Sequence, residues 1–221
     1  MAKNPTNTNS GKRQYGGFTI RLAITIVIGF LIVDAYFIYS SYTDYLDKSE
    51  QEVMERLQAI TSTAALDIDG NAHKKLQEQY KVKDAVTENR QDSTYSKLQQ
   101  KLYSVQAANN LNTSIYTLFW KDDAKSEDDQ WNFYYGVTSQ NPCFRHSYNT
   151  APDVFRKLFN EGGTIPVYTT ENGKWISAFS PIKDSEGNIV AVVQADETFD
   201  SFITAAKGVL VRNVLISLIV L

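Results

Sequence analysis

The chain has 221 residues, which is enough for one domain of ordinary size with membrane segments but too few for two large domains. Hydrophobic residues make up 43% of the sequence and aromatic residues 12%, so the chain can bury a substantial core, and this composition excludes a disordered protein. The formal net charge of −3 shows no bulk bias toward nucleic acid. The single cysteine, Cys143, excludes an internal disulfide, and we interpret it as a small structural residue.

The first apolar segment, Phe18 to Ser40, can cross a hydrocarbon core of about 30 Å as a helix. Bulky residues at its exit, such as Tyr36 and Phe37, are unsuited to signal-peptide cleavage, so we expect a retained transmembrane helix over residues 18–40. Residues 1–40 hold four basic residues and one acid, whereas residues 41–206 hold 16 basic residues and 24 acids. The positive-inside rule therefore predicts a cytoplasmic tail over residues 1–17 and an extracytoplasmic domain over residues 41–206.

The last apolar segment, Gly208 to Leu221, begins like a returning span but holds only 14 residues. We therefore expect residues 207–221 to be the start of a second, truncated transmembrane helix of a longer protein. Asp34 lies inside the first span, where a carboxylate is costly against lipid. It either faces a partner helix or extends toward the outer interface, and we favour the outer interface.

Residues 42–66 are predicted to continue the first span as a helical stalk. Leu46, Val53 and Ile60 lie one heptad apart, and Leu57 and Ala64 occupy the other seam position. This seam has two interpretations: a homodimer interface through residues 42–66, or a helix that packs on its own domain.

A break at residues 67–71 precedes a short helix over residues 72–80. Asp69 or Asn71 would cap this helix, and Asp67, Asp69, Asn71 and Glu78 also fall at ligand positions of a calcium loop. That loop needs glycine where this chain has Ala72, so we favour capping and predict no metal site. The next residue, His73, has no partner at metal-ligand spacing, and we interpret it as a solvated surface residue.

The remaining sequence predicts one helix and then mainly strands. The apolar period predicts a helix over residues 95–109, strands over 114–120 and 131–137, and a short helix over 153–159. An acidic loop joins the first two strands, and we interpret it as a solvated tip and not as a cation site. Three further strands, over residues 164–170, 174–182 and 188–196, are separated by turns at Gly173 and Gly187 and predict an antiparallel meander.

The run from Gly173 to Asp196, GKWISAFSPIKDSEGNIVAVVQAD, resembles the recurring strand, Pro-Ile turn, Gly turn and closing strand of the Cache (PDC) family of extracytoplasmic PAS-like sensor domains. The order of elements over residues 40–206 is similar to that family as well. The resemblance implies an α+β fold, with a five-stranded antiparallel PAS-like sheet and a long N-terminal helix, between the two membrane helices.

In Cache sensors a small ligand binds between the sheet and the excursion that follows its second strand. The resemblance places Arg145, Tyr148, Tyr134, Tyr116 and Trp175 around such a pocket, where an arginine among aromatic rings would suit a carboxylate or another anion. The alternative is that these aromatic residues are core and that Arg145 lies on the surface. Asp196 resembles an aspartate common in the family, but capping of the next helix explains it equally well.

No catalytic motif is present, and the sequence implies no cofactor, so we do not expect an enzyme within residues 1–221. We predict the ligand-sensing region of an inner-membrane signalling receptor, which relays a conformational signal to a cytoplasmic output domain such as a histidine kinase, nucleotide cyclase or phosphatase. The alternative is a membrane-assembly protein whose acidic ectodomain docks a partner.

Overall fold

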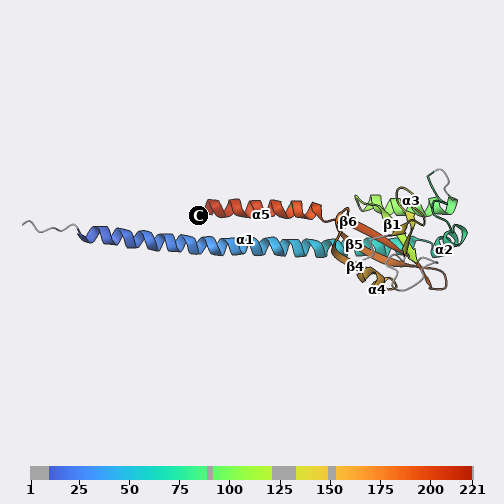
Figure 1. Ribbon diagram of the computed structural model, residues 1–221, viewed down its shortest axis with the longest axis horizontal. Coiled ribbons are helices and arrows are strands. Elements are labelled where there is room, and N and C mark those ends of the chain that lie inside the picture. The colour runs from blue at the N-terminus through green and yellow to red at the C-terminus, as the bar shows by residue number, and fades with distance from the viewer. Residues whose placement is uncertain (1–9, 89–91, 121–132, 149–152, 221) are drawn as a thin grey trace, which may run out of the picture. The chain divides into compact units, whose positions relative to one another are not determined.

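The computed structural model describes residues 10–88, 92–120, 133–148 and 153–220. The predicted acidic loop between the first two strands lies outside these residues. The chain divides into two compact units: one contains residues 1–46 and 204–221, and the other contains Asp47–Ile203. The long helix α1, Ser10–Asp67, contributes to both units. Figure 1 labels the helices and most of the strands along the chain.

The first unit is a pair of helices, the N-terminal part of α1 and the part of α5 (Asp200–Val220) from Thr204 onward. Within the described residues, α1 is the one helix long and apolar enough to cross a membrane, by length and composition. The hydroxyl of Ser217 donates to the Asp34 carboxylate at 2.7 Å. Asp34 therefore faces a partner helix, and our preference for an outward-extending side chain was wrong.

The helices of the second unit begin where the sequence offers capping carboxylates. Asp69 accepts a hydrogen bond from the backbone N–H of Ala72 and caps α2, Gly70–Gln79, as predicted. Asp92 caps α3, Ser93–Ala108, in the same way. A Cβ atom on Gly70 would lie 2.2 Å from the Lys183 carbonyl oxygen, so only glycine lets α2 approach the sheet this closely.

The sheet has six antiparallel strands in the order β3-β2-β1-β6-β5-β4. They are β1 (Ile115–Trp120), β2 (Phe133–Thr138), β3 (Ser147–Tyr148), β4 (Gly163–Thr170), β5 (Gly173–Lys183) and β6 (Ile189–Thr198). The five predicted strands, the β1/β2 pairing and the β4-β5-β6 meander are confirmed. The predicted count of five was wrong, because β3 has two residues, too few to show a hydrophobic period.

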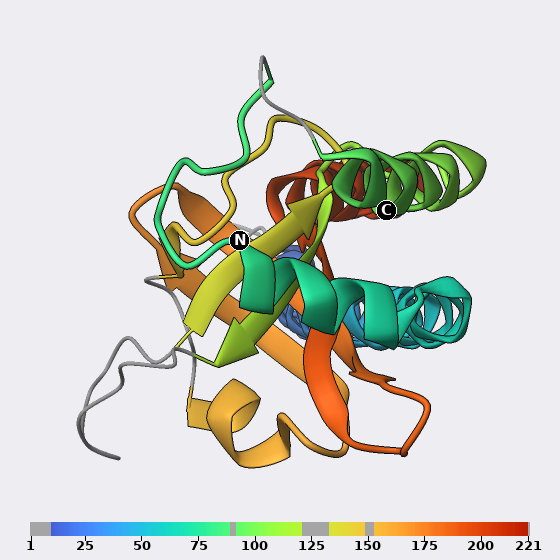
Figure 2. The same ribbon diagram turned by 90° about the vertical axis from the view of Figure 1, so that its right-hand side faces the viewer.

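The two faces of the sheet contribute side chains to two separate hydrophobic clusters, because side chains alternate between the faces along a strand. On one face, α1, α2 and α3 pack against Ile115, Phe119 and Ile176. On the other face, the short helix α4, Asp153–Leu158, packs with Phe155 against Phe179 and its neighbours. Figure 2 shows the sheet with α2 and α3 on one side and α4 on the other. The fold is thus α+β, with a long N-terminal helix.

All the residues of the predicted stalk seam except Leu46 lie in this first cluster. Val53, Leu57, Ile60 and Ala64 are at most 7% exposed and pack within the domain's own core. Of the two interpretations of the seam, the structure shows packing on its own domain, so these four residues are not available to a second copy. Leu66, on the same helix, is 90% exposed.

The surface assignment of His73 was also wrong. Its side chain is fully buried; one ring nitrogen lies 2.8 Å from the Thr117 hydroxyl and the other 2.8 Å from the Gln77 amide nitrogen. The ring packs edge-on against Phe119. Burial lowers the pKa of His73 to about 4, so the ring is neutral at pH 7.

Candidate functional site

The five ligand residues expected from the sequence do not meet in one pocket. Tyr134 and Arg145 lie on the face covered by α2 and α3, whereas Tyr116 and Tyr148 lie on the face covered by α4. Strand alternation explains the division, because neighbouring residues of β2 point to opposite faces: Tyr134 toward the first cluster, Tyr135 toward the second.

Arg145 is a buried residue that holds the end of α2. Its guanidinium donates to the backbone carbonyls of Tyr80 at 2.5 Å and Gln77 at 3.0 Å. The same group lies 5.3 Å from the ring centre of Phe119 and 5.4 Å from that of Tyr134. The alternative that placed Arg145 on the surface is wrong, since its side chain is 5% exposed. The contacts of Arg145 lie on the face of the sheet that α2 and α3 cover.

The other face carries a half-buried carboxylate with three hydrogen-bond donors. Asp196 of β6 accepts hydrogen bonds from the Tyr116 hydroxyl at 2.6 Å, the Ser177 hydroxyl at 2.5 Å and the Gln194 amide at 2.8 Å. The Tyr168 hydroxyl lies 2.8 Å from the Ser177 hydroxyl. The side chain of Asp196 therefore belongs to the sheet face, and capping of α5 does not explain it.

Tyrosine rings surround this carboxylate. The ring centres of Tyr116 and Tyr135 lie 5.1 Å apart, and those of Tyr135 and Tyr148 lie 5.3 Å apart. The Gln194 amide also donates to the hydroxyls of Tyr116 and Tyr148. We call this set the Asp196 cluster; it consists of Tyr116, Tyr135, Tyr148, Tyr168, Ser177, Gln194 and Asp196.

Burial shifts the pKa values of the acid and the phenols in this cluster. It raises the pKa of Asp196, and the three donated hydrogen bonds work against that rise. Burial and the nearby Asp196 charge raise the pKa of Tyr116 well above its ordinary value. The pKa values of Tyr135 and Tyr168 are raised as well, chiefly by burial. The cluster thus holds neutral phenols around one acid, and a cation at this place would favour the ionised form of that acid.

Gln194 supplies a second feature that points to a ligand. Its side chain is fully buried, and its amide oxygen has no hydrogen-bond partner among the residues that the structure describes. A buried acceptor without a donor costs about 1–3 kcal/mol. A ligand N–H group could satisfy this oxygen while it also contacts Asp196.

Trp175 lies on the same face of β5 as Ser177, two residues away, but near the end of the strand. Its indole N–H donates to the Thr170 hydroxyl at 3.0 Å, across the β4-β5 hairpin. The structure thus brings Tyr116 and Tyr148 together, with Trp175 farther along that face.

Cys143 plays no evident chemical part. Burial raises the pKa of its thiol to about 11, so the thiol stays protonated at neutral pH. Within the described residues, no three His, Cys, Asp or Glu side chains gather to hold a metal ion.

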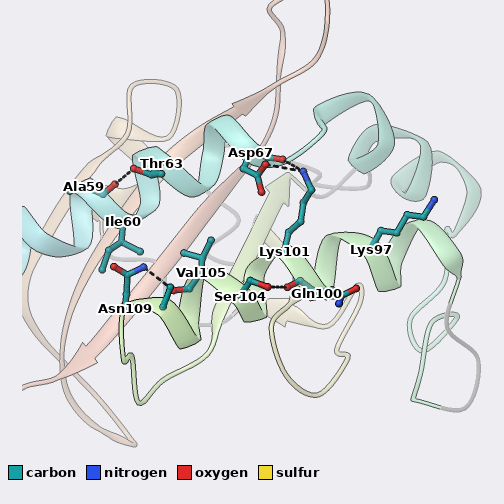
Figure 3. A pocket seen from close by; sticks show the side chains of 11 residues that line it. Ala59, Ile60, Thr63, Asp67, Lys97, Gln100, Lys101, Ser104, Val105 and Asn109 are labelled. Atoms are coloured by element: carbon teal, nitrogen blue, oxygen red, sulfur yellow. Dashed lines mark hydrogen bonds and ion pairs between the residues drawn. The ribbon is translucent and has the colours of Figure 1, made fainter.

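A separate groove of about 820 Å³ lies between α1 and α3. Figure 3 shows its apolar Ile60 and Val105 side chains and, at one end, the Asp67–Lys101 ion pair at 3.0 Å. No member of the Asp196 cluster lines it. The groove and the Asp196 cluster are therefore different surfaces.

Sequence reasoning missed Tyr135, Tyr168, Ser177 and Gln194. The two-residue period of the strands was a usable signal, because it puts Gln194 on the same face as Asp196, and Ser177 on the same face as Trp175. The cross-strand register that joins these faces, with Ser177 opposite Asp196 and Tyr116 opposite Gln194, comes only from the structure.

No family model matches the sequence, and no curated protein matches it. The fold is similar to the sensory domain of the Campylobacter jejuni chemoreceptor Tlp3 (CcmL), at 15% identity and a TM-score of 0.41, over 75% of this chain and 64% of that chain. It is also similar to the periplasmic sensory domain of the C. jejuni chemoreceptor Tlp1, at 9% identity and a TM-score of 0.43, over 76% of this chain and 61% of that chain.

A Tlp3 structure with isoleucine bound is a further neighbour, at 14% identity and a TM-score of 0.41, over 76% of this chain and 64% of that chain. The chain spans less than two thirds of the length of these neighbours. All three are sensory domains of chemoreceptors.

Proposed function

We propose that this chain is the extracytoplasmic ligand-sensing region of a transmembrane signalling receptor, and that the Asp196 cluster binds a small ligand with a protonated amine. The observation that carries the proposal is the half-buried Asp196 carboxylate beside the buried, unpaired Gln194 oxygen. A carboxylate withdrawn from water gains from a compensating charge, and an ammonium group supplies one together with N–H donors for the Asp196 carboxylate and the Gln194 amide oxygen.

The surrounding tyrosines support a cation for a second reason. Aromatic ring faces attract ammonium groups, and four tyrosines of the cluster surround the acid. The predicted anionic ligand depended on Arg145, whose hydrogen bonds to the end of α2 lie on the other face of the sheet. A ligand at Asp196 would therefore be cationic at its contact point.

The apolar stretch of α1 supports the membrane part of the proposal. In this placement residues 18–40 cross the inner membrane with the N-terminus in the cytoplasm, residues 41–206 lie outside, and residues 207–221 begin a returning span. A cytoplasmic output domain would follow outside the present sequence. Binding at the sheet would shift α1 and α5 and so change the output.

A thermal unfolding screen of the full chain in detergent tests the ligand class. The probes are small amines (amino acids and polyamines) and, as matched negatives for the amino acids, the corresponding carboxylic acids without the amino group. We expect at least one amine to raise the unfolding temperature and the matched acid to leave it unchanged.

Two variants localise the effect. Asp196→Asn keeps the shape of the side chain and removes its charge, so the amine response should disappear. Asp153→Asn is the control, since Asp153 is a highly exposed acid in α4. A response that survives Asp196→Asn, or a panel without any amine response, would contradict the proposed site and favour the docking ectodomain.

A further inference from the structure

The two helices of the first unit meet along one stripe. The half-buried residues of α1 include Asp34, Ile38, Tyr42 and Tyr45, which recur every three or four residues. Neighbours off the stripe, such as Val33, are largely exposed. On α5 the corresponding half-buried residues are Val209, Leu210, Asn213 and Ser217. This spacing is the seam of two packed helices.

Among the residues that the structure describes, two hydrogen bonds join the helices across the seam, and α5 donates both. The Ser217 hydroxyl donates to Asp34 Oδ2 at 2.7 Å, and the Asn213 amide donates to the Ser41 hydroxyl at 3.3 Å. The later donor contacts the earlier acceptor, so the helices run antiparallel. Figure 1 shows α5 alongside this part of α1.

The Asp34 contact differs in kind from an ordinary surface hydrogen bond. Asp34 follows Ile32 and Val33, which are 65% and 50% exposed and would face lipid in the membrane placement proposed above. A carboxyl group in that environment has no water to bind, so it depends on donors from a neighbouring helix. Ser217 is the donor that the structure provides.

We propose that Asp34 and Ser217 form an intramembrane latch that holds α5 at one height along α1, with Ser41 and Asn213 as a second bond farther along the seam. The inference rests on the proposed membrane placement, because water would compete for the same groups outside lipid. An α-helix rises about 5.4 Å per turn, so a slide of α5 by one turn separates Ser217 from Asp34. Any signal that moves α5 lengthwise along α1 must first open the latch.

Disulfide cross-linking of the full chain in lipid bilayers measures the latch. The parent protein carries Cys143→Ser, to remove the native thiol, with Tyr45→Cys and Val209→Cys. These two positions lie on the seam four residues beyond Ser41 on α1 and four before Asn213 on α5. Because the helices run antiparallel, the two new thiols should be neighbours while the latch is closed. The parent should therefore form the disulfide rapidly under mild oxidation.

Removal of either latch partner should slow that reaction. Interhelical hydrogen bonds in membranes change association by about threefold on average, so Ser217→Ala and Asp34→Leu should each slow cross-linking about threefold or more. Asp34→Asn keeps an acceptor oxygen and should react like the parent. Thr25→Ala is the matched control, since the Thr25 hydroxyl bonds the Arg21 carbonyl of its own helix.

Two results would overturn the latch. One is a parent that forms no disulfide between the two introduced thiols, which would show that the helices do not pair in this register. The other is a rate for Ser217→Ala and Asp34→Leu that equals the rate for Thr25→Ala. Cross-linking needs no ligand, so a failure of the amine-binding proposal would leave this measurement unaffected.

Discussion

The Tyr116 hydroxyl donates a 2.6 Å hydrogen bond to the Asp196 carboxylate, on the sheet face opposite to Arg145. Tyr116 comes from β1 and Asp196 from β6, two adjacent strands whose residues are 80 positions apart in the chain. The bond places Asp196 among phenol groups, and the Arg145 guanidinium lies on the other face of the sheet. This arrangement makes the Asp196 cluster, and not Arg145, the centre of the ligand hypothesis.

Asp196 should make the protein less stable as the pH rises. Burial raises the pKa of Asp196 in the folded state, so above the ordinary value near 4 the folded protein holds a proton that the unfolded chain releases. The contribution of Asp196 to stability is present at low pH and is lost as the pH rises through the folded pKa. Chemical denaturation of wild type and Asp196→Asn between pH 3 and pH 7 measures it. The stability of wild type relative to the variant should fall over this range, and a constant or rising difference would contradict the assignment.

His73 should act in the opposite direction. Its pKa is lowered from 6.5 to about 4 by burial, so stability is lost as the pH falls from about 6.5 toward 4. One group contributes at most about 1.4 kcal/mol per pH unit. His73→Gln should remove this part of the pH dependence of unfolding, whereas the control His146→Gln leaves His73 in place and should keep it. Equal pH profiles for the two variants would show that His73 is not the buried histidine.

Arg145→Met should destabilise the fold and leave ligand binding intact. The substitution removes the donors to the Tyr80 and Gln77 carbonyls, and an unsatisfied buried acceptor costs about 1–3 kcal/mol. We therefore expect urea unfolding to show a loss of about 2 kcal/mol or more, while the amine response of the folded protein persists. Loss of the amine response without loss of stability would return Arg145 to the ligand site.

Leu57 and Leu66 test whether the α1 seam packs in the core of its own domain or forms an interface between two copies. Leu57 is fully buried in the core of the domain, so Leu57→Ala should lower the free energy of unfolding by about 2–5 kcal/mol. Leu66 is 90% exposed, and Leu66→Ala should change that free energy by less than about 0.5 kcal/mol. If Leu57→Ala instead changed only the oligomeric state, the seam would be an interface between copies.

Local patterns in the sequence determined the helices, the five longer strands and the turns. The hydrophobic period, the cap at Asp69, and the turn glycines Gly173 and Gly187 act over a few residues, and the structure contains the helices and turns that they predict close to the predicted bounds. The short strand β3 was not predicted, because its two residues form a strand only through their pairing with β2.

Only the tertiary structure decided which face each side chain occupies. Sequence spacing could not show that His73 is buried under Thr117, or that Arg145 and Tyr116 lie on opposite faces, because these outcomes depend on which elements cover each side of the sheet. The helices that pack on each face come from segments far away in the chain. A hydrophobic period predicts that a side chain is buried, but it does not predict which residues that side chain contacts. The candidate site therefore depends on the strand register. Ser177 lies opposite Asp196, and the residues around either position do not predict this pairing.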